Sequence, residues 1–455
     1  MRSQNSPVWY NPAVVTSVSA KVEPAATGRS RQGIGAKIRR RVFLVLLLAL
    51  LGFAIPSDGY LGPDRTGLAA NLAVGDQGFR LGAWEVQAIE QKMHDFFSHP
   101  GDERSATEQH DLVVSYFRTI EKVNDLSGQI EAIHADPAQT SPNTAAAPLQ
   151  TELDAVRAEQ AARRPAVEWI LQRQVSTVLT EAGLGTSGRV WPPVMFQFTE
   201  GPDQLIISPR DRILVQQTIL MAPDQTVSNK ERVEAEAEKQ PDVSALVEGI
   251  GGLGAYPTMV IPVSDLSWVT DTVAHEWTHN YLEFRPLGWH YSDNGDTRTL
   301  NETVASIVGG EIGQAVIQRY YPELVPPPAP PPAPPPAKAG QASAAAKPSF
   351  DYGQTMRETR LHVDDLLAKG RVSEAQAYME QQRRVLWDHG YRIRKLNQAY
   401  FAFHGSYAVG PGATDPIGDK LHALRQRSPD LLAFVRTVAG ITSVKQLDAA
   451  LARGG

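Results

Sequence analysis

A five-residue motif, HEWTH at residues 275–279, constrains the fold of this 455-residue chain more than any other feature. The motif has the pattern HExxH. Residues four apart lie on one face of an α-helix, so both imidazoles can reach one metal ion if the segment is helical. Glu276 can then point toward the same ion and take a proton from a bound water without being a ligand. We therefore predict a helix over residues 264–284, capped by Ser264 or Asp265.

A third metal ligand is expected, because a catalytic zinc ion typically keeps three protein ligands and one open position. Glu302 is the candidate, since it follows His279 by 23 residues and opens the next predicted helix, at 299–320. Thr299 or Asn301 is expected to cap that helix. If the two helices form a hairpin, Glu302 on the first turn projects beside the HExxH helix.

The segment HEWTHNYL followed by NETVAS resembles the gluzincin metallopeptidases, which include thermolysin-like enzymes and many aminopeptidases. The resemblance covers about residues 245–451. It implies that His275, His279 and Glu302 are Zn²⁺ ligands and that Glu276 is the catalytic base. It also implies that an edge strand before the HExxH helix binds the substrate backbone by strand addition. Residues 254–259 could have that role here, or could be ordinary sheet structure.

The stretch at residues 396–407 is similar to the tail of a bacterial aminopeptidase family within this group. By this resemblance, Tyr407 leads the candidates for stabilising the oxyanion that develops during hydrolysis. The other candidates are His290, Tyr291, Tyr400 and His404. Each of these side chains could instead serve packing alone.

One position departs from the gluzincin pattern. Many members have an acid four residues after the ligand glutamate, where it orients the first histidine, whereas this chain has Ser306. Such support fixes the tautomer of a ligand histidine. Asp271, one turn before His275, is a candidate substitute.

The remaining sequence predicts an α+β fold that is predominantly α, with a zincin-like helix pair and one small mixed sheet. Apolar residues recur at helical spacing through residues 76–185, with a loop at 136–148 and a break or kink near Pro165. Strands are expected at residues 190–198, 204–207, 212–221 and 255–263. One further helix is expected at residues 229–238. The prolines in 255–263 suggest an edge strand. The glycine-rich residues 249–254 lack the context of a phosphate-binding loop.

The amino-terminal region predicts a membrane segment. Residues 42–55 carry no charge and follow Lys37 and residues 39–41, which are all arginine. Fourteen residues are fewer than the about 20 that span a bilayer, so the segment fits a signal peptide or a short anchor. We favour a single-pass anchor because the preceding basic region is long. Residues 1–41 would be cytoplasmic and the catalytic part extracytoplasmic, or secreted if the segment is cleaved.

Composition excludes several classes of site and partner. The chain has no cysteine, which excludes disulfides, cysteine-ligated metal centres and cysteine nucleophiles. Residues 1–41 carry a net charge of +7, and the rest carries −13. This acidic body argues against a nucleic-acid partner. Residues 326–336 contain nine prolines and read as a solvated insertion loop or, alternatively, as a ligand for a proline-binding partner.

Two functions of different classes follow. The favoured one is a membrane-anchored zinc metallopeptidase acting on a peptide or protein substrate, with aminopeptidase and endopeptidase activity both open. The alternative is a non-catalytic envelope scaffold that keeps a zincin-like fold.

The expected divisions of the chain are a basic tail (1–41), membrane segment (42–55), tether (56–75), helical domain (76–185), zinc-binding core (186–324), Pro/Ala-rich insertion (325–348) and C-terminal helical part (349–455).

Overall fold

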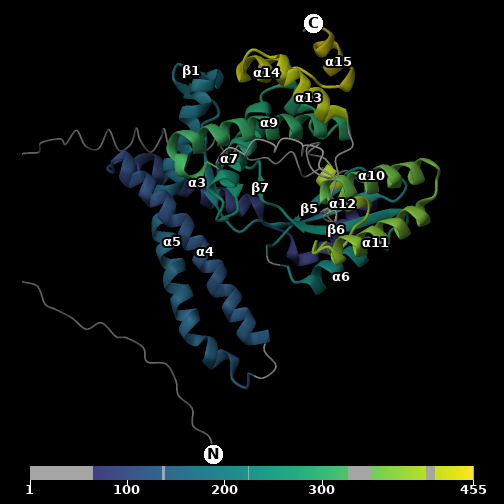
Figure 1. Ribbon diagram of the computed structural model, residues 1–455, viewed down its shortest axis with the longest axis horizontal. Coiled ribbons are helices and arrows are strands. Elements are labelled where there is room, and N and C mark those ends of the chain that lie inside the picture. Colours follow the sequence, from purple (N-terminus) through teal and green to yellow (C-terminus); the bar gives the residue numbers. More distant parts are fainter. Residues whose placement is uncertain (1–64, 136–138, 224, 326–349, 406–415, 454–455) are drawn as a thin grey trace, which may run out of the picture. The chain divides into compact units, whose positions relative to one another are not determined.

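The computed structural model describes residues 65–135, 139–223, 225–325, 350–405 and 416–453, which belong to one compact unit (Figure 1). Helices predominate and the sheets are small, so the expected α+β class is confirmed. The expectation of one small sheet is wrong, because the described strands form two three-stranded sheets and one two-stranded sheet. The predicted membrane segment, the proline-rich insertion and Tyr407 lie outside the described residues. Within the described residues, no helix has the length and apolar character needed to cross a membrane.

The N-terminal part is helical, as expected. Its elements are α2 (Arg65–Val74), η1 (Gly75–Gln77), α3 (Leu81–Ser98), α4 (Ala106–Ala135), α5 (Pro142–Leu179) and η2 (Thr180–Leu184). Helices α4 and α5 form a long hairpin (Figure 1). Of the break or kink predicted near Pro165, the break does not occur, because α5 continues through Pro148 and Pro165. A proline removes one backbone hydrogen bond, and packing against α4 keeps the remainder of the helix in place.

The larger sheet is antiparallel and has β4 at its centre. Its order is β5 (Gln217–Met221), β4 (Asp203–Pro209) and β6 (Val243–Gly249). Alternate residues of β4 point to opposite faces. Leu205 and Ile207 pack in a cluster with α2 and α6 (Val227–Ala237), whereas Ile206 packs with α12 (Gln398–Gly405). This sheet is therefore covered by helices on both faces.

The smaller sheet is mixed and has only one open edge. Strand β8 (Thr258–Val260) lies between β3 (Phe196–Phe198), which is parallel to it, and β7 (Gly252–Leu253), which is antiparallel. The prediction that residues 255–263 form an edge strand is wrong, because Pro257 and Pro262 flank β8 and leave its paired N–H groups intact. The outer edge of β3 is covered by α5.

Two side chains of α5 hold that covered edge. Glu168 and Gln172 accept hydrogen bonds from the backbone N–H groups of Phe198 (2.6 Å) and Phe196 (2.9 Å). Glu168 also forms a buried ion pair with Lys92 of α3. Strand β7 is therefore the exposed edge of this sheet. A separate hairpin joins β1 (Gly185–Thr186) to β2 (Arg189–Val190).

The central helix pair is α7 (Leu266–Leu282) and α9 (Gly295–Tyr320). The Asp265 side chain caps α7, as predicted, by accepting hydrogen bonds from two backbone N–H groups. The cap predicted for the second helix is wrong, because Asn294 caps α9 in a reciprocal arrangement with Thr297. The helix therefore begins earlier, and Glu302 lies on its third turn instead of its first.

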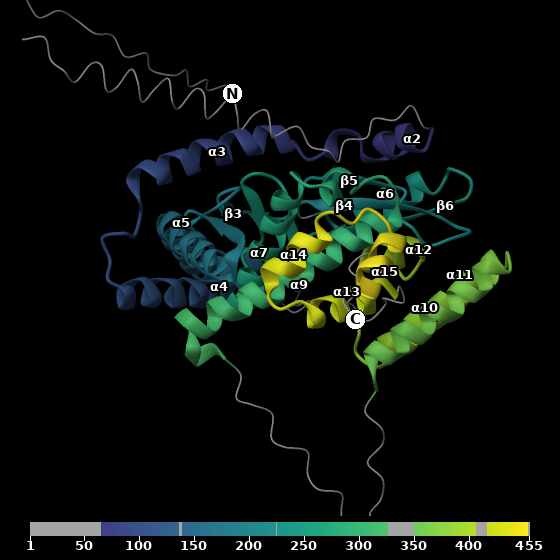
Figure 2. The ribbon, with the colours of Figure 1, turned by 90° about the horizontal axis from the view of Figure 1, so that it is seen from above.

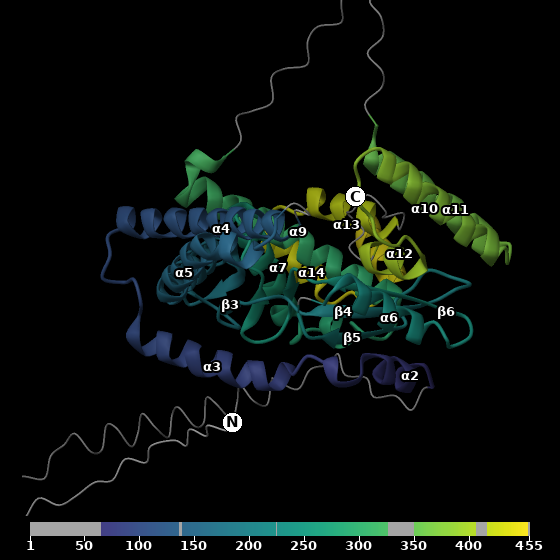
Figure 3. The ribbon, with the colours of Figure 1, turned by 90° about the horizontal axis from the view of Figure 1, so that it is seen from below.

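The remaining helices complete the core. They are α8 (Pro286–Trp289), η3 (Pro322–Leu324), α10 (Tyr352–Ala368), α11 (Val372–Asp388), α13 (Pro416–Arg427), α14 (Leu431–Val438) and α15 (Val444–Arg453). Helices α10 and α11 form a second hairpin (Figures 2 and 3). One hydrophobic cluster joins residues of α4, α5, α7, α9 and the last three helices. The helix pair α7 and α9 thus lies at the centre of the largest core.

Candidate metal centre

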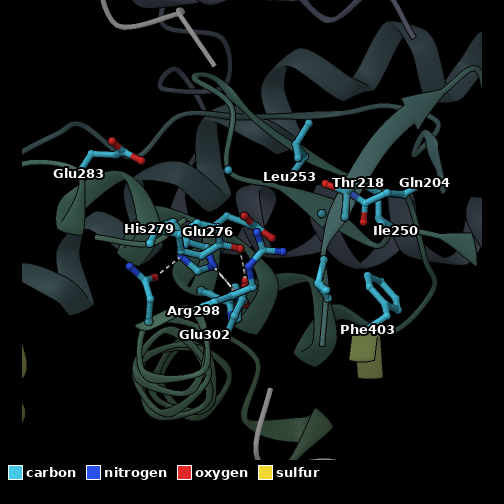
Figure 4. Close-up of a pocket in the computed structure, with 16 residues that line it drawn as sticks. Gln204, Thr218, Ile250, Leu253, Glu276, His279, Glu283, Arg298, Glu302 and Phe403 are labelled. Carbon is cyan, nitrogen blue, oxygen red and sulfur yellow. Dashed lines mark hydrogen bonds and ion pairs between the residues drawn. The ribbon is translucent and has the colours of Figure 1, made fainter. Parts of the chain in front are cut away.

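Three side chains from the central helix pair converge on one point. His275 and His279 lie one turn apart on α7, and Glu302 faces them from α9 (Figure 4). The two Nε2 atoms are 3.1 Å apart, and each lies 3.5 Å from Oε2 of Glu302. The structure therefore brings together the three ligands expected from the sequence, in a group that could hold a metal ion.

The spacing of these three atoms fits tetrahedral coordination. Metal–ligand bonds of about 2.1 Å at a tetrahedral centre place neighbouring ligand atoms roughly 3.4 Å apart. The observed separations, 3.1 Å and twice 3.5 Å, bracket this value. Three protein ligands would leave one position open toward the adjacent cleft.

Asn301 orients the second histidine. Its Oδ1 lies 2.7 Å from Nδ1 of His279, and its Nδ2 donates to the carbonyl oxygen of Leu287 at 3.4 Å. The amide orientation makes Oδ1 an acceptor, so Nδ1 of His279 carries the proton and Nε2 presents its lone pair to a metal. From the sequence, Asn301 is expected only as a helix cap. The sequence signal that could have indicated this role is the position of Asn301 directly before the candidate ligand Glu302.

Replacing Asn301 with alanine is expected to weaken metal binding by about 10- to 100-fold, because His279 loses the partner that sets its tautomer. Metal affinity would be measured by competition with a chromophoric chelator. The matched control is Gln314→Ala, which removes an exposed amide from the same helix. Equal affinities for the two variants would contradict the assigned role of Asn301.

Besides His279 and Glu302, the first histidine has Ser306 and Asp271 nearby. Oγ of Ser306 lies 3.5 Å from Nδ1 of His275 and donates to the backbone oxygen of Glu302 at 2.9 Å. Because its proton is engaged there, Ser306 can only accept from His275. The carboxyl group of Asp271 lies against Gly309 of α9. Burial raises the pKa of Asp271, and the nearby His275 opposes the rise. Ser306 thus stands where many gluzincins have an acid, and the carboxyl group of Asp271 lies nearby.

The charges of the ligand group are strongly coupled. Burial lowers the pKa of His279, but the Glu302 carboxylate outweighs this effect and raises that pKa to about 9. Conversely, burial raises the pKa of Glu302, but the interactions with His279 and, to a smaller extent, His275 outweigh burial. The pKa of Glu302 therefore lies well below its usual range. Without a cation, the group is therefore an internal ion pair at neutral pH, and a bound metal must displace the proton of His279.

A cleft of about 140 Å³ is lined by the three candidate metal ligands and by Glu276. Strand β7 borders it, since Gly252 and Gly254 are among its lining residues. A Cβ atom on Gly252 would lie 2.6 Å from Oε1 of Glu276, and one on Gly254 would lie 3.4 Å from Oε2. The glycines therefore allow the carboxylate to lie against the open sheet edge. Of the residues 254–259 considered for strand addition, Gly254 lines the cleft, whereas Thr258 and Met259 lie in the central strand β8.

The candidates for oxyanion stabilisation have different positions. Tyr291 lines the cleft, and its hydroxyl donates to Oε1 of Glu302 at 2.6 Å. His290 is bound to Asp293 outside the cleft. In α12 the rings of Tyr400 and His404 are in contact at an angle of 42°, and burial lowers the pKa of His404 to about 4. Tyr407 lies outside the described residues, so among the described candidates Tyr291 alone lines the cleft.

No protein-family model matches the chain, and no curated protein or solved structure matches it either. The resemblance to gluzincins therefore rests on the residues of the two helices and on the C-terminal stretch. The function is accordingly proposed from the chemistry of the site.

Proposed function

We propose that the protein is a zinc metallopeptidase of the gluzincin type with a zincin-like catalytic fold. The observation that carries the proposal is the triangle formed by Nε2 of His275, Nε2 of His279 and Oε2 of Glu302, with edges of 3.1–3.5 Å and the Glu276 carboxylate in the adjoining cleft. Two imidazoles and one carboxylate with an open fourth position are the ligand set of hydrolytic zinc sites.

The residues present fit a zinc ion. When bound, zinc would supply a Lewis acid that polarises the scissile carbonyl and acidifies a water molecule. Glu276 would accept the proton of that water and deliver it to the departing amine as the C–N bond breaks. Tyr291 lines the cleft beside Glu302, and its hydroxyl would have to leave Oε1 of Glu302 before it could donate to an oxyanion. Strand β7 would hold the substrate backbone.

The proposed location of the enzyme rests on sequence. The apolar residues 42–55 behind an arginine cluster favour a single-pass anchor in the cell membrane, with the catalytic part extracytoplasmic. A proline-binding partner for residues 326–336 stays a weaker hypothesis. The substrate is a peptide or protein, and the acidic body of the chain disfavours nucleic acid.

The test is zinc stoichiometry and peptide cleavage by the full-length protein in detergent. We expect about one zinc per chain after loading, cleavage of a mixed peptide library, loss of cleavage when a chelator removes the metal, and recovery when zinc is restored. Protein that stays metal-free after zinc loading would reject the proposal. Zinc binding without cleavage of any peptide would favour the non-catalytic scaffold instead.

A further inference from the structure

We propose that Arg298 binds a carboxylate of the substrate on the leaving-group side of the scissile bond, so that the enzyme prefers peptides with an acidic group close to that bond. This inference rests on the proposed peptidase function. It assigns the substrate class to the same cleft and gives a role to a residue that the sequence analysis did not single out.

The first support is position. Arg298 precedes Glu302 by four residues on α9, so both side chains project from the same face of the helix. Arg298 is half-buried and lines the cleft together with Glu276 and Glu302. In Figure 4 its side chain reaches from α9 across the cleft toward Glu276. The guanidinium therefore points to the side of the cleft on which Glu276 lies.

The second support is charge. Arg298 is the only arginine or lysine among the described residues that line the cleft. The guanidinium lies 5.1 Å from the centre of the Tyr291 ring, and no described carboxylate forms an ion pair with it. Among the other half-buried arginines of the described residues, Arg394 pairs with Glu234 and Arg425 with Glu311, whereas Arg285 has no such partner. A guanidinium in a cleft with unused donors matches the two oxygens of a carboxylate.

The third support is the direction of the chemistry. In the proposed hydrolysis the C–N bond breaks, the acyl carbon gains the hydroxyl of water, and the nitrogen gains a proton from Glu276. The half of the substrate that departs as an amine must therefore lie beside Glu276. Since Arg298 extends to that side, its partner is a carboxylate of this half, either the C-terminal carboxylate or an acidic side chain.

The experiment compares matched peptides on the full-length, zinc-loaded protein. One pair differs only in a free or amidated C-terminus one residue after the scissile bond, and a second pair has Glu or Gln at that residue with the C-terminus amidated. Binding would be measured calorimetrically on a Glu276→Gln background, and kcat/KM on the otherwise unchanged chain. We expect the acidic member of at least one pair to bind at least about 10-fold tighter. The pair that shows the preference identifies the source of the carboxylate.

Substitutions at Arg298 then test the residue itself. In the Arg298→Gln variant the acidic and the neutral peptide of a pair should bind about equally. Arg298→Lys should keep only part of the preference for the acidic peptide, because the ammonium group lacks the planar arrangement of donors of a guanidinium. Arg285→Gln is the matched control, since Arg285 is also half-buried over a tyrosine ring, 4.4 Å from the centre of Tyr281, but lines a different cavity. It should retain the full preference.

The failure of this inference is distinguishable from failure of the proposed function. Cleavage without any acidic preference, or a preference that survives Arg298→Gln, overturns the role of Arg298 while the peptidase assignment stands. Absence of cleavage with every peptide rejects the peptidase assignment, and the calorimetric comparison still decides whether Arg298 binds carboxylates. Absence of binding by every peptide overturns the inference as well.

Discussion

Replacing Glu276 with glutamine is expected to lower the rate of peptide hydrolysis by on the order of 10²- to 10⁴-fold while zinc stays bound. The amide keeps the shape of the side chain but cannot accept the proton of the attacking water. The three metal ligands are unchanged, so the stoichiometry should stay at about one zinc per chain. The measurement is kcat/KM together with metal content on the same preparation.

The matched control is Glu311→Gln on α9. This substitution also removes a half-buried carboxylate, but Glu311 pairs with Arg425 and does not line the cleft. Its turnover should equal that of the unaltered chain. If Glu276→Gln kept full activity with zinc bound, Glu276 would not be the base, and the mechanism proposed for this site would be wrong.

Gly313→Ala is expected to lower the free energy of unfolding by about 1–3 kcal/mol, because it overpacks the contact between α7 and α9. A Cβ at this position would lie 2.6 Å from the backbone nitrogen of Asp271 and 2.8 Å from its Cα. Those atoms belong to a helix backbone and cannot rotate away. The helices must move apart, which would also separate Glu302 from the two histidines and weaken zinc binding.

Gly310→Ala, on the same helix, is expected to raise the free energy of unfolding instead of lowering it. Apart from its own stretch of helix backbone, nothing in the described residues lies within 4 Å of a Cβ built at Gly310, so alanine costs nothing in packing and favours the helical state by up to about 1 kcal/mol. Chemical denaturation and zinc affinity would be measured for both variants. A Gly313→Ala protein as stable as Gly310→Ala would show that the two helices do not depend on this close approach.

Local sequence signals were sufficient for the HExxH helix. Its Asp265 cap, its length and the common face of His275 and His279 all follow from residues within one or two turns of each other. The predominantly helical α+β class follows in the same way from apolar periodicity. The assignment of residues 255–263 to an edge strand was wrong because the sequence does not show at which residue the strand begins or ends. A proline just outside a strand removes no hydrogen bond of the sheet, whereas one inside the strand does.

The sequence alone indicated which side chains could hold a metal ion, because a candidate ligand set is a matter of residue type and helical spacing. Only the tertiary structure decided how they meet. The close approach of α9 through Gly313 places Glu302 beside the histidines, and β7 borders the cleft because α5 covers the opposite sheet edge. Asn301 and Arg298 acquire their positions in the same way. Such contacts join segments distant in the chain, so no local pattern encodes them, and they form only when the core packs.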